Sequence, residues 1–157
     1  DLGLVEGICR LPNLRYTTFL QDELVAVVHT GSKLSLPDEI TPEDLSRIPL
    51  VLRERGSGTL DVFERALSEH NMKLSSLNVL LYLGSTESIK LFLEHTDCIG
   101  IVSIRSISHE LLSGTFRVIE IKGMPMLREF CFAQPQGQES GLSQVLMQFA
   151  MHHNKKL

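Results

Sequence analysis

The sequence predicts an α/β fold in which helices cover both faces of a parallel sheet. Between residues 49 and 102, apolar strand patterns and helical patterns alternate in the order strand, helix, strand, helix, strand. The second of these strands, 77–83, is apolar on both faces, which is typical of a parallel strand covered on each side. With 157 residues, the chain is long enough for one ordinary domain with a core of its own.

The turn at residues 53–59 connects the first strand of this series, 49–52, to a helix that we expect to end near Asn71. Gly56 and Gly58 allow backbone angles that other residues resist. Ser57 and Thr59 place hydroxyl groups and backbone N–H groups at the beginning of the helix, where its partial positive charge collects. A corner of this kind can hold a small anion.

A second corner of the same kind follows the strand 77–83, where Ser85 and Thr86 precede a helix expected over 86–94. We hypothesise that the two corners face one cleft. Glu6 ends an earlier strand, 2–5, and ligands in open α/β sheets bind at strand ends. The alternatives are that the hydroxyls only cap their helices and that Glu6 is a solvated strand-end carboxylate.

The remaining patterns complete the expected element list. Residues 16–20 and 23–28 predict two extended segments separated by the polar pair Gln21-Asp22, and 116–121 and 129–133 predict strands that leave one sheet and enter another. Ser140 can cap a last helix. Its predicted buried stripe consists of Leu142, Val145, Leu146, Phe149 and Ala150, whereas Met147 and Met151 lie to one side and indicate either a partner contact or a wider buried face.

Composition and motifs argue against several functions. The net charge is −4, from 19 acidic and 15 basic residues, and no basic stripe predicts direct binding of nucleic acid. No apolar run is long enough to span a membrane and no signal peptide is recognised, so we expect the cytoplasm. Cys9, Cys98 and Cys131 form no C-x-x-C pair and are expected to be reduced thiols.

We expect no catalytic residue, cofactor or metal site in this chain. None of the histidines at 29, 70, 95 and 109 has a sequence context that marks a nucleophile's base, and no G-x-S-x-G elbow occurs. The pair His152-His153 lies near the C-terminus without further ligands at metal spacing. The turn at 56–58 lacks the complete spacing of a dinucleotide-binding motif or a P-loop. Binding of a small anion is therefore the function that the sequence still indicates for this turn.

Taken in order, several segments resemble the effector-sensing domain of LysR-type transcriptional regulators. The resemblance covers nearly the whole chain and depends on the order and spacing of segments that are individually unspecific. They are the opening strand 1–6, the strand 22–28, the segments 40–45 and 49–54, the corners 56–59 and 84–90, the strand 99–103 and the segment 128–130. Departures from the family pattern occur near Cys98 and at 32–35.

This resemblance implies a fold similar to type 2 periplasmic binding proteins, with two α/β lobes and a central cleft, the first lobe being incomplete. Residues 24–117 would form the second lobe, and 1–23 with 118–157 the remainder of the first. The family's DNA-binding winged helix-turn-helix would be absent from this chain.

For function, the resemblance implies a module that senses a small-molecule effector, expected to be an anion or carboxylate, at Ser57, Gly58, Thr59, Ser85 and Thr86. It also implies a homo-oligomer, a dimer or tetramer at full length, that reaches DNA only through the absent domain. The alternative is a periplasmic-type solute-binding protein for uptake of a small anion. An enzyme on the same scaffold is a weaker alternative, because it would need a catalytic constellation.

Overall fold

The computed structural model describes residues 1–6, 11–137 and 141–154 of the chain. The chain divides into two compact units. Unit 1 comprises Asp1–Asp22 and Arg128–Leu157, and unit 2 comprises Glu23–Leu127. Residues 118–127, which the resemblance groups with the other part of the chain, belong to unit 2. The identity of these units with the family's two lobes stays a prediction.

The sheet of unit 2 is built around three parallel strands, β4 (Leu50–Arg53), β5 (Val79–Leu83) and β6 (Ile99–Ser103). Its order is β2-β6-β4-β5, in which β2 (Leu14–His29) runs antiparallel to β6. On its other side, β2 pairs antiparallel with β7 (Phe116–Ile121), and β7 pairs in turn with β3 (Glu39–Ile40). The predicted series of strand, helix, strand, helix, strand is therefore observed, and its three strands are parallel.

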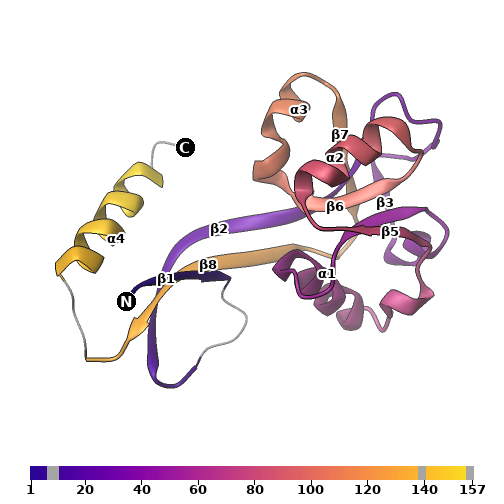
Figure 1. Ribbon diagram of the computed structural model, residues 1–157. Coiled ribbons are helices and arrows are strands. Elements are labelled where there is room, and N and C mark those ends of the chain that lie inside the picture. The colour runs from indigo at the N-terminus through magenta and orange to yellow at the C-terminus, as the bar shows by residue number, and fades with distance from the viewer. Residues whose placement is uncertain (7–10, 138–140, 155–157) are drawn as a thin grey trace. The chain divides into compact units, whose positions relative to one another are not determined.

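Helices cover the two faces of this sheet (Figure 1). Helix α1 (Gly58–Glu69) packs its apolar side chains into one core cluster, and α2 (Thr86–His95) packs Ile89 and Leu93 into another. A short helix, α3 (Ser108–Leu112), joins the second cluster through the partly buried Leu111. Three 3-10 helices complete the unit, η1 (Pro42–Ser46), η2 (Leu74–Ser76) and η3 (Ile104–Ile107).

Gly100 lets α2 lie directly on β6. A Cβ atom built at this residue would be 2.9 Å from Cγ2 of Ile89 and 3.1 Å from Cδ1 of Leu93, both of which are buried. Carbon atoms in ordinary contact are about 3.5–4.0 Å apart. Glycine is thus required here by the closeness of the helix rather than by its backbone angles.

Strand β5 differs from the prediction, because it is an edge strand and not a covered inner strand. It ends the sheet order, and Leu80, Leu81 and Tyr82 are 46%, 42% and 40% exposed. The physical reason is the path of the chain, which crosses back over β4 after α2 and adds β6 on the other side. An uninterrupted apolar run indicates burial on both faces, but it does not fix the position of a strand in the sheet.

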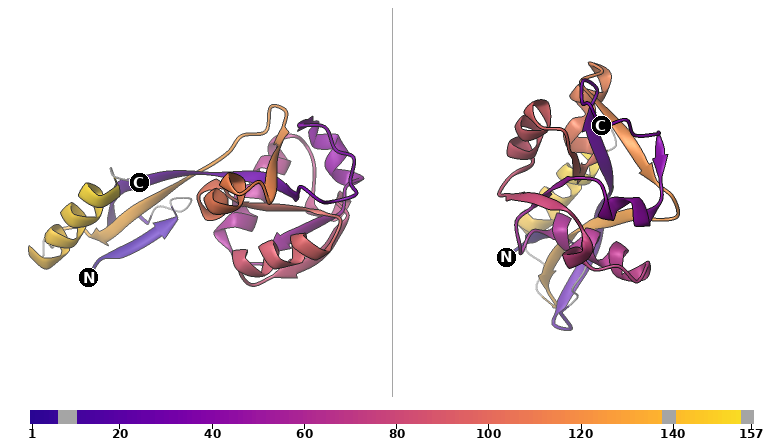
Figure 2. Two further views of the ribbon diagram at one scale, coloured as in Figure 1. Left: turned by 90° about the horizontal axis from the view of Figure 1, so that it is seen from above. Right: turned by 90° about the vertical axis from the view of Figure 1, so that its right-hand side faces the viewer.

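Unit 1 contains β1 (Gly3–Glu6), which pairs antiparallel with β8 (Met126–Pro135), and helix α4 (Gly141–Asn154). Strands β2 and β8 both contain residues of each unit (Figure 2). The two extended segments expected at 16–20 and 23–28 are one continuous strand of 16 residues. Gln21-Asp22 does not break it, because the buried Asp22 carboxylate is paired with Arg128.

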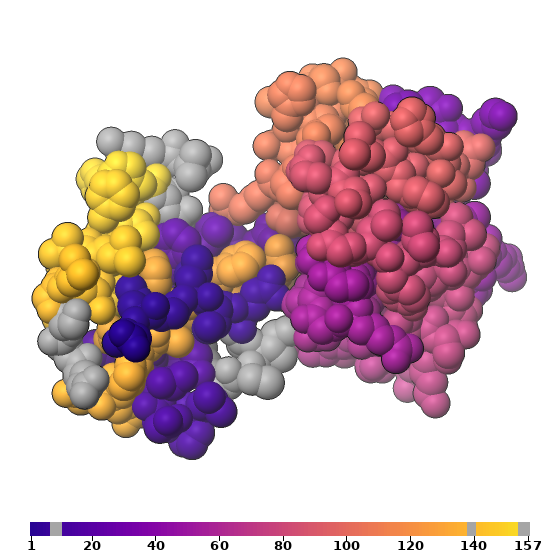
Figure 3. Space-filling view, in the orientation of Figure 1, coloured from indigo at the N-terminus to yellow at the C-terminus, as the bar shows by residue number. Residues whose placement is uncertain are grey.

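The stripe expected to be buried in α4 lies at the surface of its unit, where Figure 3 shows the helix in yellow. Leu142, Val145, Leu146 and Phe149 are between 54% and 81% exposed in the described part of the chain. In contrast, Met147, Ala150 and Met151 are partly buried. The predicted buried face was wrong, since the side of α4 that packs is the one bearing the methionines. Gly7, Cys9 and Ser140 lie outside the described residues.

Candidate functional site

The first predicted corner connects β4 to α1 and is built as a capped helix start. Gly56 has a φ of 88°, a conformation that side chains rarely tolerate. The backbone N–H of Leu60 donates a hydrogen bond of 3.2 Å to Ser57 Oγ. Ser57 and Thr59 are both buried, and Gly58 is partly exposed. Because Ser57 Oγ accepts this bond, its O–H is still available as a donor toward an anion.

Arg53 does not supply free positive charge to this corner. Its guanidinium donates two hydrogen bonds to Glu54, at 2.7 and 2.9 Å. The same bonds lower the pKa of the Glu54 carboxyl. Arg55 is exposed. Helix polarity and hydroxyl groups are therefore what the corner offers an anion.

The second predicted corner connects β5 to α2. The N–H of Ser88 donates to Ser85 Oγ over 3.1 Å, and the two serine hydroxyls are 2.8 Å apart. Thr86 is the first residue of the helix, and both Ser85 and Thr86 are partly exposed. This corner is more open to solvent than the one at Ser57.

The strand register brings the two corners to one edge of the sheet. Arg53 and Leu83, the last residues of β4 and β5, are register partners. The N–H of Glu54, just beyond β4, donates to the carbonyl of Leu83 over 3.1 Å. Both helices thus begin at the carboxyl edge of neighbouring parallel strands, where open α/β sheets bind ligands. They then pass to opposite faces of the sheet, so a shared cleft stays a prediction.

A third serine at this edge was not included among the predicted site residues. Ser103 ends β6, the other neighbour of β4, and its Oγ accepts a 3.2 Å hydrogen bond from the N–H of Arg105. Since β5 and β6 lie on opposite sides of β4, the reversal in strand order falls between β4 and β6. Ligands favour such a reversal point. The serine that follows the apolar strand 99–102 was the available sequence signal.

Glu6 belongs to unit 1 and has an ionic partner there. Its carboxylate is 2.6 Å from Arg128 Nη1, and Arg128 Nη2 is 2.7 Å from Asp22 Oδ2. The Arg128 and Asp22 side chains are buried, at 8% and 1% exposed. Glu6 thus helps to neutralise a buried arginine, and its own side chain is 27% exposed. A role for Glu6 toward the effector stays a prediction.

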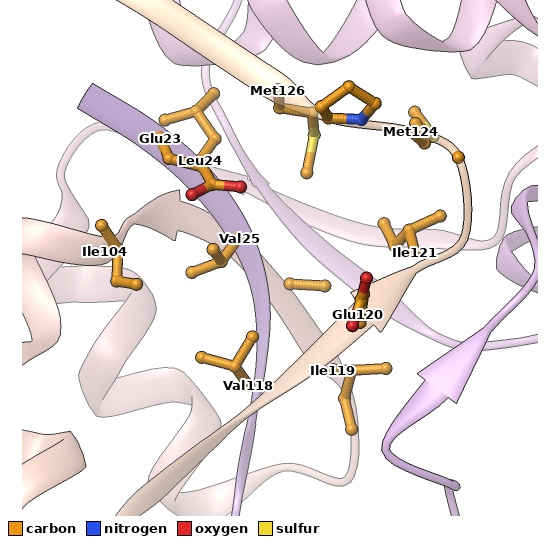
Figure 4. A pocket seen from close by; sticks show the side chains of 13 residues that line it. Glu23, Leu24, Val25, Ile104, Val118, Ile119, Glu120, Ile121, Met124 and Met126 are labelled. Atoms are coloured by element: carbon orange, nitrogen blue, oxygen red, sulfur yellow. The ribbon is translucent and has the colours of Figure 1, made fainter. Parts of the chain in front are cut away.

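A pocket of about 480 Å³ lies in unit 2 and was missed at the sequence level (Figure 4). Glu23 and Glu120 lie on its two sides, on β2 and β7, and the rest of its wall is mostly apolar. The apolar side chains come from β2, β7, Ile104, the turn before β8 and the first residue of β8. They are Leu24, Val25, Ala26, Ile104, Val118, Ile119, Ile121, Met124, Pro125 and Met126.

Part of the pocket lining lies beside the carboxyl end of β6. Leu24 is the register partner of Ser103, which ends β6, and Ala26 is the partner of Ile119 on β7. The lining part of β2 is separated from β4 by one strand, and strands lie about 4.8 Å apart, so the distance between them is about 10 Å. The pocket is therefore lined by strands at least two places away from β4, and no residue of the α1 corner is among its described lining residues.

An ion-pair group fixes the helices that flank this edge. Lys90 Nζ lies 2.6 Å from Glu110 on α3 and 3.0 Å from Glu87. Burial lowers the pKa of Lys90, but hydrogen bonds to Glu110 and Glu87 together outweigh this effect and raise it. The bond from Lys90 lowers the pKa of Glu110 in return.

The described residues contain little else that suggests reaction chemistry. Burial, with a smaller effect from Asp97, raises the pKa of the Cys98 thiol to about 11. A thiol with such a pKa is a poor nucleophile at neutral pH. Within the described ranges, no group of three or more His, Cys, Asp or Glu could hold a metal ion. In the same part of the chain, no helix is long and apolar enough to cross a membrane.

Comparison with known protein families shows which family the chain belongs to. Residues 1–155 match the model of the LysR substrate binding domain. This chain belongs to the LysR substrate-binding domain family. The match covers nearly the whole chain and confirms both the resemblance in its segments and the type 2 periplasmic-binding-protein-like fold.

Several curated relatives of the chain are named as transcriptional regulators. The chain is 33% identical over 121 residues to the uncharacterized HTH-type regulator YeiE of Escherichia coli K12, covering 77% of the chain and 40% of YeiE. It is 29% identical over 144 residues to the HTH-type transcriptional activator CmpR of Synechocystis, covering 91% of the chain and 46% of CmpR. The chain therefore spans less than half the length of these relatives.

Solved regulatory domains of the family share the fold. The regulatory domain of Synechocystis CcmR in complex with 2-PG gives a TM-score of 0.83 at 25% identity and covers all of this chain and 74% of the CcmR chain. The effector binding domain of QuiR in complex with shikimate gives 0.78 at 20% identity, covering 99% of this chain and 72% of the QuiR chain.

Proposed function

We propose that this chain is the effector-sensing part of a LysR-type transcriptional regulator and that a small anion or carboxylate binds at the α1 corner. The observation that carries the proposal is the common carboxyl edge of β4 and β5, at which Ser57, Gly58 and Thr59 begin one helix and Ser85 and Thr86 begin the other. Helix beginnings favour negative charge through their free N–H groups and the helix dipole.

Relatives support a small-molecule effector rather than a transported solute. The curated regulators above carry HTH-type names, and the CcmR regulatory domain was solved with 2-PG bound. In the proposed mechanism, the effector favours one arrangement of the regulator over another, and it can do so only by binding the two arrangements with different affinity. DNA is reached through a separate winged helix-turn-helix, in the cytoplasm.

We further propose that the regulator assembles as a homo-oligomer. The edge strand β5 exposes Leu80, Leu81 and Tyr82 and carries no charged residue, and such edges readily pair with another chain. Light scattering on the purified regulator measures this directly. A monomer at micromolar concentration would contradict the assembly.

Calorimetric titration of the complete sensing domain with 2-PG, acetate and sulfate tests the anion site. Losing a hydrogen bond to a charged group costs about 1.5–3 kcal/mol, so Ser57→Ala should weaken binding by about 10- to 150-fold. Thr86→Ala tests the second corner in the same way, and Ser57→Thr should retain most of the affinity, because it keeps the hydroxyl group.

Ser68→Ala is the matched control. Ser68 lies near the end of the same helix, where its hydroxyl bonds to the carbonyl of Glu64. It should leave the dissociation constant unchanged. If Ser57→Ala and Ser68→Ala bind the anion equally well, the α1 corner is not the effector site.

A further inference from the structure

The pocket lined by β2, β7, Ile104 and the segment 123–126 combines an apolar wall with two carboxylates that have no ion-pair or side-chain hydrogen-bond partner among the described residues. Its volume of about 480 Å³ lies within the range of 300–1,000 Å³ that is usual for small-molecule sites. Glu23 and Glu120 border it, and neither makes an ion pair or side-chain hydrogen bond within the described residues. Figure 4 shows both carboxylates beside the apolar side chains.

Further negative charge lies next to Glu120. Glu39 on β3 is its register partner in a parallel pair, and both side chains are exposed. Like charges at neighbouring register positions are unfavourable. The basic residues Arg105 and Lys122 adjoin lining residues in sequence, but neither is among the described residues that line the pocket.

This combination selects among ligand classes. An anion entering the pocket would be repelled by Glu23 and Glu120. A neutral ligand would not neutralise the carboxylates, and one without a hydrogen-bond donor would also displace their water without replacing its hydrogen bonds. A cation with a hydrocarbon body satisfies both parts of the site. Its charged group neutralises the carboxylates, and its apolar part covers Val25, Val118 and Ile119.

We propose that this pocket is a second ligand site, distinct from the anion corner, and that it takes an organic ammonium ion with an aliphatic or arylalkyl body. The site lies wholly in unit 2, so it is present in the 157-residue chain. Its occupant carries the opposite charge to the effector proposed for the α1 corner, and the two proposals can therefore fail separately.

Three probes with similar apolar bodies test the charge preference. The 157-residue chain is titrated separately with 2-phenylethylamine, 2-phenylethanol and 3-phenylpropanoate. Binding is measured by NMR from the chemical-shift changes of the backbone amides. We expect the amine to bind at least about fivefold more tightly than the alcohol, and the carboxylate more weakly than either. Added salt should weaken the binding of the amine but not that of the alcohol or the carboxylate. Equal affinity for amine and alcohol would refute the proposal.

Substitutions locate the site. Glu23→Gln and Glu120→Gln should each weaken amine binding by about two- to fivefold, the effect of an exposed ion pair, without changing the affinity for the alcohol. Glu43→Gln, on η1 and away from the lining, is the charge-matched control and should change nothing. If Glu43→Gln weakens amine binding as much as Glu23→Gln does, the amine is attracted by the net charge of the protein and the pocket is not its binding site.

Two further variants separate this site from others. Val118→Phe fills the pocket and should abolish binding of the amine and the alcohol, and its thermal unfolding shows whether the fold is kept. Ser57→Ala should leave amine binding unchanged whether or not the α1 corner binds an anion. Amine binding that survives Val118→Phe in a folded chain would overturn the assignment.

Discussion

Replacing Gly100 by alanine tests how closely α2 must pack on β6 to hold the corner at Ser85. The added methyl group would lie 2.9 Å from Cγ2 of Ile89 and 3.1 Å from Cδ1 of Leu93. Overpacking of this kind costs about 1–3 kcal/mol. Removing the conformational freedom of glycine from a strand offsets about 0.5–1 kcal/mol. The free energy of unfolding should therefore fall by about 0.5–2 kcal/mol.

Urea unfolding measures this loss. With a slope of about 2 kcal/mol per molar urea, the midpoint should fall by about 0.25–1 M. Gly84→Ala is the control, because a Cβ atom there meets nothing within 4 Å and the backbone angle is not in the left-handed region. In an Ile89→Ala background, the cost of Gly100→Ala should largely disappear. The packing argument fails if Gly100→Ala and Gly84→Ala unfold at the same midpoint.

Two ion-pair groups give the remaining predictions. Lys90→Met should cost about 2–3 kcal/mol at pH 7, because it leaves the largely buried Glu110 unpaired. The pKa of Glu110 is lowered in the folded state, so its contribution is present above the unfolded value of about 4.5 and is lost as pH falls below it. The difference in the free energy of unfolding between the wild type and Lys90→Met should therefore shrink from pH 7 to pH 3. A difference that does not change with pH would contradict the role given to Glu110. Arg128→Met should cost about 3 kcal/mol by removing the arginine that neutralises the buried Asp22 carboxylate, and Asp22→Asn in the same chain should recover part of that loss.

Local chemistry made the corners predictable. Gly56 adopts a left-handed angle, and Ser57 and Ser85 accept the expected capping bonds from the third residue beyond them. These features depend on residues within one turn of each other, so a local sequence pattern is enough to predict them. The parallel arrangement of the three strands was also predictable, because parallel strands need a long crossover connection and a helical pattern lies between each strand and the next.

Long-range partners explain what could not be predicted. Asp22 was interpreted as a break between strands, since its ionic partner Arg128 is 106 residues away. The place of β5 at the sheet edge depends on where β6 is added later in the chain. The pocket is lined by residues of β2, Ile104 and the segment 118–126, which no local pattern joins.

Unit 2 is one uninterrupted stretch of chain, from Glu23 to Leu127, whereas unit 1 is assembled from a stretch before it and a stretch after it. Protein synthesis proceeds from the N-terminus, and compact regions generally fold as units during translation. The strands and helices that carry the α1 corner and the pocket, together with Met126 at the start of β8, precede the rest of β8 and α4 in the order of synthesis. These binding elements can therefore form on the ribosome ahead of α4 and of the part of β8 that belongs to unit 1.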